Sequence, residues 1–256
     1  MSDDIILNVL SYNIHGLPNI LTPYKNSNRI KEIINEVNSY DLIFLQENWV
    51  YQDLIKNNFS NNKFIIGGKN KFTNKDKPRR SSGLNIITSD KISIYDYQEY
   101  QFKNCNGWLV NANDCFASKG FIYSRLLLDE DTLNVYVTHL DAGNSDKDMS
   151  VRETQMNQLI SSIEKISNSG PLIVCGDFNI DYYSNQNIID TLENKFSLID
   201  LDWNLNISNE FKIDYVFFRS GINTKITVYD VGINSDFINY SDHYPIEFKM
   251  LLEEVE

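Results

Sequence analysis

The stretch PLIVCGDFNID, residues 171–181, begins as a buried strand and ends in polar side chains. Residues 172–174 form a continuous apolar run, as expected for a strand that is covered on both faces. Asp177 and Asn179 follow after a short interval. Because successive side chains of an extended chain point to opposite faces, these two polar groups share one face. The stretch therefore predicts a core strand that presents an acid and an amide at its end.

Other runs of the same character recur along the chain, rich in Ile, Val, Leu, Phe and Tyr and often bounded by Gly, Pro, Asn or Asp. They are IILNVLSYN (5–13), DLIFLQE (41–47), GLNIITS (83–89), KGFIYSRLLL (119–128), LNVYVTH (133–139), KIDYVFF (212–218) and YPIEFKML (244–251). Several of them also carry a polar group at one end. These groups are Asn13, Glu47, His139, Asp214, Asp242 and His243.

If these strands share a sheet core, their polar ends converge on one edge. Such a cluster does not stabilise a core, because a buried ionised carboxylate is unfavourable unless it is paired or bound to a metal. Converging carboxylate and amide oxygens suit a hard divalent cation such as Mg²⁺. The chain lacks the Cys and His spacing of a zinc site. The pattern therefore favours a magnesium-dependent site.

Each signal alone has an ordinary structural explanation. Asp177 and Asn179 fit an Asx-turn, Glu47 can simply end a strand, and Asp242 with His243 can form a turn. His15, in NIHG, fits either a loop position or a supporting role near Asn13. The signals favour a functional site because they occur together, each at a strand end.

Two helices are predicted between the strands. Residues 28–37 repeat apolar side chains at helical spacing, with Ser27 or Asn28 as the cap. Residues 150–166 carry a second apolar stripe, with Ser150 and Glu153 as a capping box. Residues 119–139 indicate a hairpin with the turn DEDT, which argues against simple parallel β-α-β alternation. The expected fold is two packed mixed sheets flanked by helices.

Length and composition bound the class of protein. With 256 residues, of which 42% are hydrophobic, the chain can build one large core, and we expect a single domain over 1–256. Neither an apolar span of membrane-crossing length nor a basic signal peptide is found, so a cytoplasmic location is expected. The three cysteines favour free thiols in a reducing compartment, with a Cys105–Cys115 disulfide as the alternative.

The net charge of −12 argues against a protein that coats nucleic acid with a basic face. One basic run, KNKFTNKDKPRR (69–80), is either a solvated loop or a surface for phosphate-bearing substrates or anionic lipid. The trio 108–110, Trp-Leu-Val, fits either core packing or contact with lipid.

The order of the polar strand ends resembles the endonuclease/exonuclease/phosphatase superfamily, the deoxyribonuclease-like proteins. The motifs that carry this resemblance span the chain: LSYNIHG, LIFLQE, VTHL, CGDFN, IDYVF and SDHYPI. The resemblance implies a four-layer α/β/β/α sandwich. Within the superfamily the chain is most similar to the neutral and bacterial sphingomyelinases, through DCFASKGFIYSRL (114–126), VTHLDAG (137–143) and YSDHYPI (240–246). It departs from them at Asp141, where they typically carry Gln, and in a short interval between Asn179 and Asp214.

This resemblance implies Mg²⁺-dependent hydrolysis of a phosphodiester, with Mn²⁺ as a substitute ion. Glu47 would hold the metal, assisted by Asn13 and, through water, by Asp242. His243 would act as the base with Asp214 as its partner, and Asp177 is a rival base. Asp177 and Asn179 would orient water and phosphate, and His139 would donate a hydrogen bond or proton on the phosphoryl side. Lys119 either contacts phosphate as a point charge or is an exposed strand-start residue.

Several functions remain open at this point. A phospholipid phosphodiesterase of sphingomyelinase type, acting as a monomer with peripheral membrane contact, is the leading hypothesis. A nuclease of the same fold would use the same metal and imidazole chemistry, but it needs a positively charged groove and aromatic side chains for bases. A non-catalytic binding module is disfavoured because every polar position that the chemistry needs is filled. A phosphomonoesterase is a further alternative.

Overall fold

The computed structural model describes residues 5–19, 26–59, 63–68, 82–107, 111–129, 131–181, 186–201, 212–237 and 239–255. The basic run 69–80 and the trio 108–110 lie outside these segments.

The first sheet has the strand order β11-β12-β1-β2-β4-β3. Its strands are β1 (Ile5–Gly16), β2 (Leu42–Asn48), β3 (Phe64–Gly67), β4 (Asn85–Thr88), β11 (Thr224–Ile233) and β12 (Ile246–Glu254). β1 runs parallel to β2, and the other neighbours are antiparallel. The sheet is therefore mixed, with its parallel pair at the centre.

The second sheet has the order β5-β6-β7-β8-β10-β9. Its strands are β5 (Ser93–Gln101), β6 (Gly120–Leu128), β7 (Asp131–His139), β8 (Leu172–Asp177), β9 (Ile199–Asp200) and β10 (Asp214–Arg219). β7 runs parallel to β8, and the other neighbours are antiparallel. The two sheets thus have the same plan, a central parallel pair with antiparallel strands around it.

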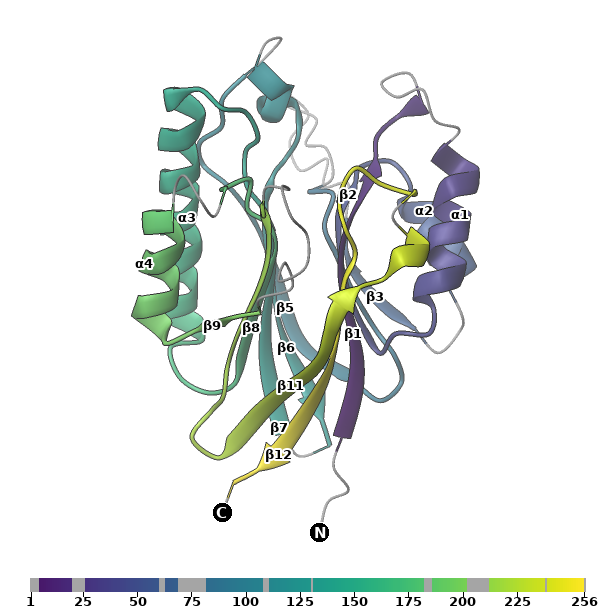
Figure 1. The fold of residues 1–256 in the computed structure, drawn as a ribbon, viewed down its shortest axis with the longest axis vertical. Coiled ribbons are helices and arrows are strands. Elements are labelled where there is room, and N and C mark those ends of the chain that lie inside the picture. The colour runs from purple at the N-terminus through teal and green to yellow at the C-terminus, as the bar shows by residue number, and fades with distance from the viewer. Residues whose placement is uncertain are drawn as a thin grey trace.

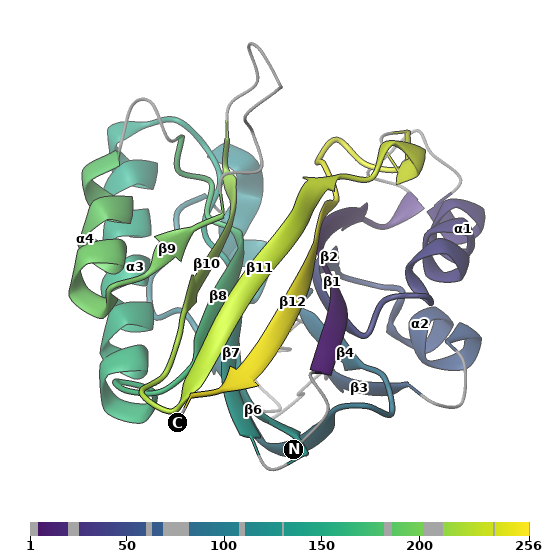
Figure 2. The ribbon, with the colours of Figure 1, turned by 60° about the horizontal axis from the view of Figure 1, so that its bottom comes forward.

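Helices cover the outer faces of both sheets (Figures 1 and 2). α1 (Asn26–Val37) and α2 (Gln52–Asn58) lie outside the first sheet, and α3 (Asp146–Ile166) and α4 (Gln186–Phe196) lie outside the second. Two short 3₁₀ turns, Asn111–Phe116 and Ser235–Phe237, complete the described elements. The order of layers is α/β/β/α, which confirms the predicted sandwich.

Three apolar clusters separate these layers. Along β1, Leu7 and Val9 belong to the cluster between the sheets, whereas Leu10, Tyr12 and Ile14 pack under the helices. The same alternation holds in β8, where Ile173 and Cys175 face the other sheet and Leu172 and Val174 face α3 and α4. Strand periodicity therefore decides which side chains enter the space between the sheets.

The helices begin earlier than the sequence predicted. α1 begins at Asn26, so Ser27 and Asn28 lie in its first turn rather than at a cap. α3 begins at Asp146, and its capping box is Ser145 with Asp148 instead of Ser150 with Glu153. The Ser145 side chain accepts from the Asp148 amide at 3.3 Å, and the Asp148 carboxylate accepts from the Ser145 amide at 2.9 Å. A shorter acid at the third helical position closes this box in place of the expected Glu.

The structure also tests the predicted hairpin and the predicted state of the cysteines. β6 and β7 form the predicted hairpin, with Leu128 opposite Asp131. The expectation of free thiols is wrong for two cysteines, because Cys105 and Cys115 form a disulfide, whereas Cys175 is unpaired and buried. A spacing of ten residues cannot decide between these states without the loop geometry. Among the described helices, none has both the length and the apolar character required to cross a bilayer.

Candidate active site

The polar strand ends meet at one end of the space between the sheets. In the second sheet, the register pairs His139 with Asp177 and Asp177 with Asp214, so these three residues form a row across β7, β8 and β10. Alternation turns the row toward the first sheet, because Val137, Cys175 and Val216, two residues away in each strand, belong to the core between the sheets. Asn13 of β1 lies on the matching face of the first sheet.

Asn13 bridges the two sheets. Its Nδ2 donates to Asp177 Oδ2 at 3.0 Å and to Glu47 Oε1 at 3.3 Å. His139 Nε2 lies 3.3 Å from Asp177 Oδ2 and 4.0 Å from Glu47 Oε1. Glu47, Asp177, Asn13 and His139 therefore form one connected group, drawn from four strands.

Glu47 reaches this group by leaving regular strand geometry. In β2, Leu42 and Phe44 face the other sheet and Ile43 and Leu45 face the helices, so alternation alone would direct Glu47 toward the helices. Its φ of +59° is left-handed, and the β1–β2 register shifts beyond Asn13 and Gln46. Such a bulge changes the direction of a side chain at a strand end. The backbone therefore places this carboxylate on the face where its partners lie.

Gly176 allows the row in the second sheet to form. Its φ is +136°, and a Cβ atom there would overlap the carbonyl oxygen of Thr138 in the neighbouring strand. β7 and β8 can therefore approach closely beside His139 and Asp177 only with glycine at this position.

His243 and Asp214 form an imidazole–acid couple. His243 Nδ1 lies 2.7 Å from Asp214 Oδ2, and its Nε2 lies 3.7 Å from Asp177 Oδ2. Burial lowers the pKa of His243, but the charges of Asp214 and Asp177 outweigh burial and raise the pKa to about 11. These two acids therefore favour an imidazolium when no cation neutralises them.

Burial shifts the pKa of two further groups in this site, Asp177 and His139. Asp177 is 1% exposed, and burial raises the pKa of its carboxyl above the ordinary value, although the charge of His243 opposes this. Burial, together with the charges of Lys119 and His243, lowers the pKa of His139 well below its usual range. His139 is therefore neutral, and its Nε2 is suited to donate to the carboxylates beside it.

The donor set suits a hard divalent cation. Glu47, Asp177 and His243 each offer a ligand atom, and these atoms lie within 4.8 Å of one another. The two carboxylates provide the oxygen ligands that Mg²⁺ prefers, and the Asn13 amide lies beside both. A cation there would also offset the charge of Asp177, which is otherwise unfavourable in a buried position.

Asp242 lies next to this group rather than within it. Its Oδ1 pairs with His15 Nδ1 at 2.9 Å, and its side chain is 62% exposed. Burial raises the pKa of Asp242, but the hydrogen bond from His15 and the charge of His243 outweigh it and lower the pKa to about 2. A metal contact of Asp242 through water stays a prediction. This pair places His15 beside Asp242, and a supporting role for His15 stays a prediction.

Asn179 and Lys119 share a partner at the edge of the site. Asn179 Nδ2 donates to the Leu140 carbonyl at 3.1 Å, and Lys119 Nζ donates to the same oxygen at 2.9 Å. Lys119 also pairs with Asp114 at 2.6 Å and is only 6% exposed, so the alternative of an exposed strand-start lysine is wrong. The backbone N–H of Asn179 donates to Asp177 Oδ1 at 2.9 Å, so the Asx-turn is present as part of the site. Substrate contact by either residue stays a prediction.

Sequence reasoning missed two neighbours of this site. Asp114 holds both Lys119 and the Ala142 amide, which donates to it at 2.9 Å. The Trp49 ring lies 6.0 Å from the ring of His139. Trp49 follows Glu47 by two residues in the chain, and this proximity could have indicated that its ring lies near the site. Asp114 precedes a lysine by five positions, a spacing that has no meaning without the loop fold.

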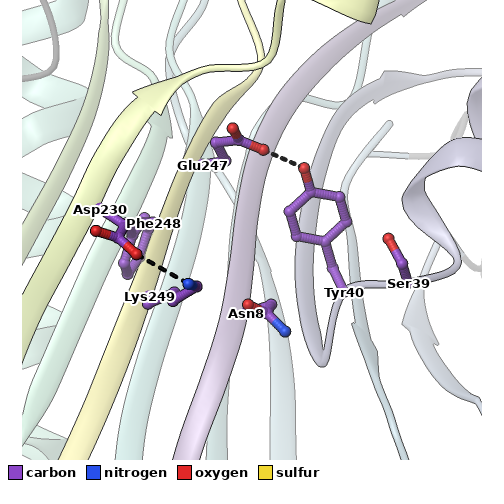
Figure 3. Close-up of a pocket in the computed structure, with 7 residues that line it drawn as sticks. All are labelled: Asn8, Ser39, Tyr40, Asp230, Glu247, Phe248 and Lys249. Carbon is purple, nitrogen blue, oxygen red and sulfur yellow. Dashed lines mark hydrogen bonds and ion pairs between the residues drawn. The ribbon is translucent and has the colours of Figure 1, made fainter.

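A separate hollow of about 410 Å³ lies on the outer face of the first sheet (Figure 3). Its lining residues are Asn8, Ser39, Tyr40, Asp230, Glu247, Phe248 and Lys249. Tyr40 bonds to Glu247, and Lys249 pairs with Asp230, as the dashed lines show. Because this hollow opens on the side of the sheet away from the strand-end acids, we do not assign it to the candidate site.

Comparison with known proteins agrees with this architecture. A model of the Endonuclease/Exonuclease/phosphatase family matches residues 10–243. A Drosophila melanogaster protein named "Putative neutral sphingomyelinase" is 23% identical over 283 residues, covering 98% of this chain and 62% of that protein. The chain thus spans less than two thirds of the length of this relative.

Solved structures share the fold. Beta toxin from Staphylococcus aureus, in a variant with bound magnesium ions, superposes with a TM-score of 0.72 at 16% identity, covering 95% of this chain and 99% of that one. Sphingomyelinase C from Streptomyces griseocarneus gives a TM-score of 0.69 at 18% identity, covering 96% of this chain and 99% of that one. Since the family model accounts for most of the chain, including every residue of the candidate site, this protein belongs to the endonuclease/exonuclease/phosphatase family.

Proposed function

We propose that the protein is a Mg²⁺-dependent phosphodiesterase, which hydrolyses a phosphodiester by in-line attack of water and acts on a phospholipid of the sphingomyelin class. The observation that carries the proposal is the His243–Asp214 couple, whose Nε2 faces the carboxylates of Asp177 and Glu47. An oriented imidazole beside converging acid oxygens is what hydrolysis of a phosphodiester by activated water needs.

Glu47 and Asp177 would hold the cation, with Asn13 fixing both carboxylates by its two hydrogen bonds. When bound there, a divalent ion supplies Lewis acidity to a phosphoryl oxygen and positive charge beside the developing transition state.

His243 would take a proton from the attacking water at Nε2. The bond of Nδ1 to Asp214 fixes the ring and the tautomer, and it stabilises the imidazolium that forms. General-base assistance of this kind contributes about 10²- to 10⁴-fold in rate. Asp177 is the rival base, because its raised pKa lies closer to neutral pH than that of an ordinary carboxyl group. Neutral His139 would donate a hydrogen bond through Nε2 on the phosphoryl side.

The substrate class rests on likeness to proteins that are named as sphingomyelinases. The net charge of −12 also argues against a protein that coats nucleic acid with a basic face. The test is a parallel assay with Mg²⁺ on sphingomyelin, lysophospholipid, plasmid DNA and abasic DNA. We expect turnover of sphingomyelin. Turnover of DNA alone would replace the lipid assignment by a nuclease, and hydrolysis of none of the four would contradict the phosphodiesterase.

A further inference from the structure

Arg29 lies in α1, outside the candidate site, yet it contacts both segments that border the site. Its Nη1 donates to the Ile14 carbonyl at 2.8 Å and also to the Tyr240 carbonyl, and its Nη2 donates to the His15 carbonyl at 2.7 Å. Ile14 and His15 immediately follow Asn13, and Tyr240 precedes His243 by three residues. One guanidinium therefore joins the end of β1 to the loop before β12.

The sheet itself does not hold these two segments together. The β1–β12 ladder is regular from Ile5 opposite Leu252 to Ser11 opposite Ile246, and it ends there. Asn13 and His243 lie beyond this last pair. The relative position of the amide and the imidazole therefore depends on contacts other than the ladder.

Side-chain bonds take over beyond the ladder. Ser241 Oγ donates to the Asn13 carbonyl at 2.7 Å, and His15 Nδ1 pairs with Asp242 Oδ1 at 2.9 Å. Tyr12 Oη also donates to the Phe237 carbonyl at 3.1 Å. Arg29 adds a further connection, and unlike these three bonds it also ties the two segments to helix α1. His15 has a φ of +46°, so the backbone turns sharply where the guanidinium binds it.

We propose that Arg29 is a positioning residue, which holds the loop carrying His243 against the end of β1 carrying Asn13. It thereby sets the separation between the imidazole and the Glu47–Asp177 carboxylates. A planar guanidinium suits this task, because its donors diverge in fixed directions toward several carbonyl oxygens, whereas an ammonium is a point charge. The catalytic consequence of this inference rests on the proposed phosphodiesterase function, but the structural consequence does not.

The chain offers a matched control. Arg219 also donates to three backbone carbonyls, those of Ser167, Gly170 and Phe196, at 2.9 to 3.1 Å. It lies at the far end of β10 from Asp214. Arg219→Met therefore removes a comparable set of bonds at a distance from the site.

The first measurement is backbone hydrogen exchange by mass spectrometry on Arg29→Met, Arg29→Lys and Arg219→Met. In the wild type, the Tyr240 amide donates to the Phe237 carbonyl at 2.8 Å and the Leu17 amide donates to the His15 carbonyl at 3.0 Å. We expect faster exchange in residues 14–17 and 239–243 of both Arg29 variants, by about tenfold or more, and wild-type exchange there in Arg219→Met. Unchanged exchange in these segments of Arg29→Lys, which keeps the charge but not the fork, would overturn the inference even if Arg29→Met failed to fold.

The second measurement is turnover of the phosphodiester that the wild type hydrolyses. We expect Arg29→Met to lower kcat by about 10²-fold, the lower end of the contribution of a positioned base, with a smaller change in KM. Added guanidinium, well below denaturing concentration, should restore part of kcat in Arg29→Ala. A wild-type kcat in the Arg29 variants, or an equal loss in Arg219→Met, would overturn the positioning role. If the wild type hydrolyses no phosphodiester, the proposed function fails, and hydrogen exchange still decides whether Arg29 holds the two segments.

Discussion

Asp177 is the residue on which most contacts of the candidate site converge. The Asn13 side chain donates to its carboxylate at 3.0 Å, and the Asn179 backbone N–H donates to it at 2.9 Å. The Nε2 atoms of His139 and His243 both lie within 3.7 Å of its Oδ2. A carboxylate that is 1% exposed is unfavourable by several kcal/mol unless neighbours or a cation compensate it. These neighbours provide donors for both oxygens of the carboxylate. We propose that their arrangement serves the chemistry rather than the stability of the fold.

Replacing the reacting groups should separate activity from stability. With Mg²⁺ present, Asp177→Asn and His243→Ala should each lower turnover by about 10²- to 10⁴-fold while the melting temperature stays close to that of the wild type. The matched control is Asp41→Asn, a buried carboxylate that binds the Asn8 amide and the Ser89 hydroxyl at 3.0 Å each. It should lower the melting temperature and leave kcat unchanged. Loss of folding in Asp177→Asn and His243→Ala would mean that the cluster is structural.

The pKa of His243 predicts a pH dependence of stability without metal. Folding raises the pKa of His243 from about 6.5 to about 11. Such a group contributes its full stabilisation below its unfolded pKa, and this stabilisation is lost as the pH rises from there toward the folded pKa. The melting temperature in EDTA should therefore fall between about pH 7 and about pH 9, and His243→Ala should flatten this fall. Equal slopes for the two proteins would contradict the imidazolium assignment.

At the scale of the elements, the pairing of β7 with β8 positions the row of His139, Asp177 and Asp214. Gly176 is the residue that permits this pairing, because its φ of +136° and its contact with Thr138 both exclude a side chain. The local sequence Cys-Gly-Asp therefore permits the strand pairing and places Asp177 in the candidate site.

In Gly176→Ala, backbone strain alone should cost about 1–3 kcal/mol of unfolding free energy. The total loss should be larger, because the new Cβ also overlaps the Thr138 carbonyl. Gly170→Ala is the control, since Gly170 has a φ of +87° but nothing within 4 Å of the position of a Cβ. Denaturant unfolding of both variants measures the difference. Equal losses of unfolding free energy would show that the close approach of β7 and β8 does not matter.

The strands that the sequence predicted are the central ones. The eight apolar runs correspond to β1, β2, β4, β6, β7, β8, β10 and β12, and the four described strands that were missed, β3, β5, β9 and β11, are the edges of the two sheets. Central strands are covered on both faces and read as apolar runs, whereas edge strands are half exposed. β5 and β11 also contain register shifts, at Ile94/Asp96 and Tyr229/Gly232, which interrupt their alternation.

Convergence of the site was predictable for the same reason, since Asn13, His139, Asp177 and Asp214 all obey strand alternation. The position of Glu47 was not, because it depends on a left-handed backbone. The His15–Asp242 pair and the Asp114–Lys119 pair depend on how loops fold over the strand ends. Loop contacts of this kind have no periodicity that a sequence pattern could show.

At the scale of the molecule, the site lies where the two sheets meet, so neither sheet alone can form it. The first sheet contributes Asn13 and Glu47, and the second contributes His139, Asp177 and Asp214. The cluster between the sheets, with Val9, Phe44, Val135 and Val216 among its members, holds these two sets at a fixed spacing. We therefore expect Glu47 and Asp177 to be preorganised for cation binding in the folded chain.

We propose that this junction of the sheets hydrolyses a phosphodiester with a divalent cation held by Glu47. The most direct measurement is sphingomyelin turnover in EDTA and after restoration of Mg²⁺ or Mn²⁺, for the wild type and for Glu47→Gln. We predict no turnover in EDTA, recovery with either ion in the wild type, and at least about a 10²-fold lower recovery in Glu47→Gln. Full turnover in EDTA, or equal recovery in Glu47→Gln, would contradict it.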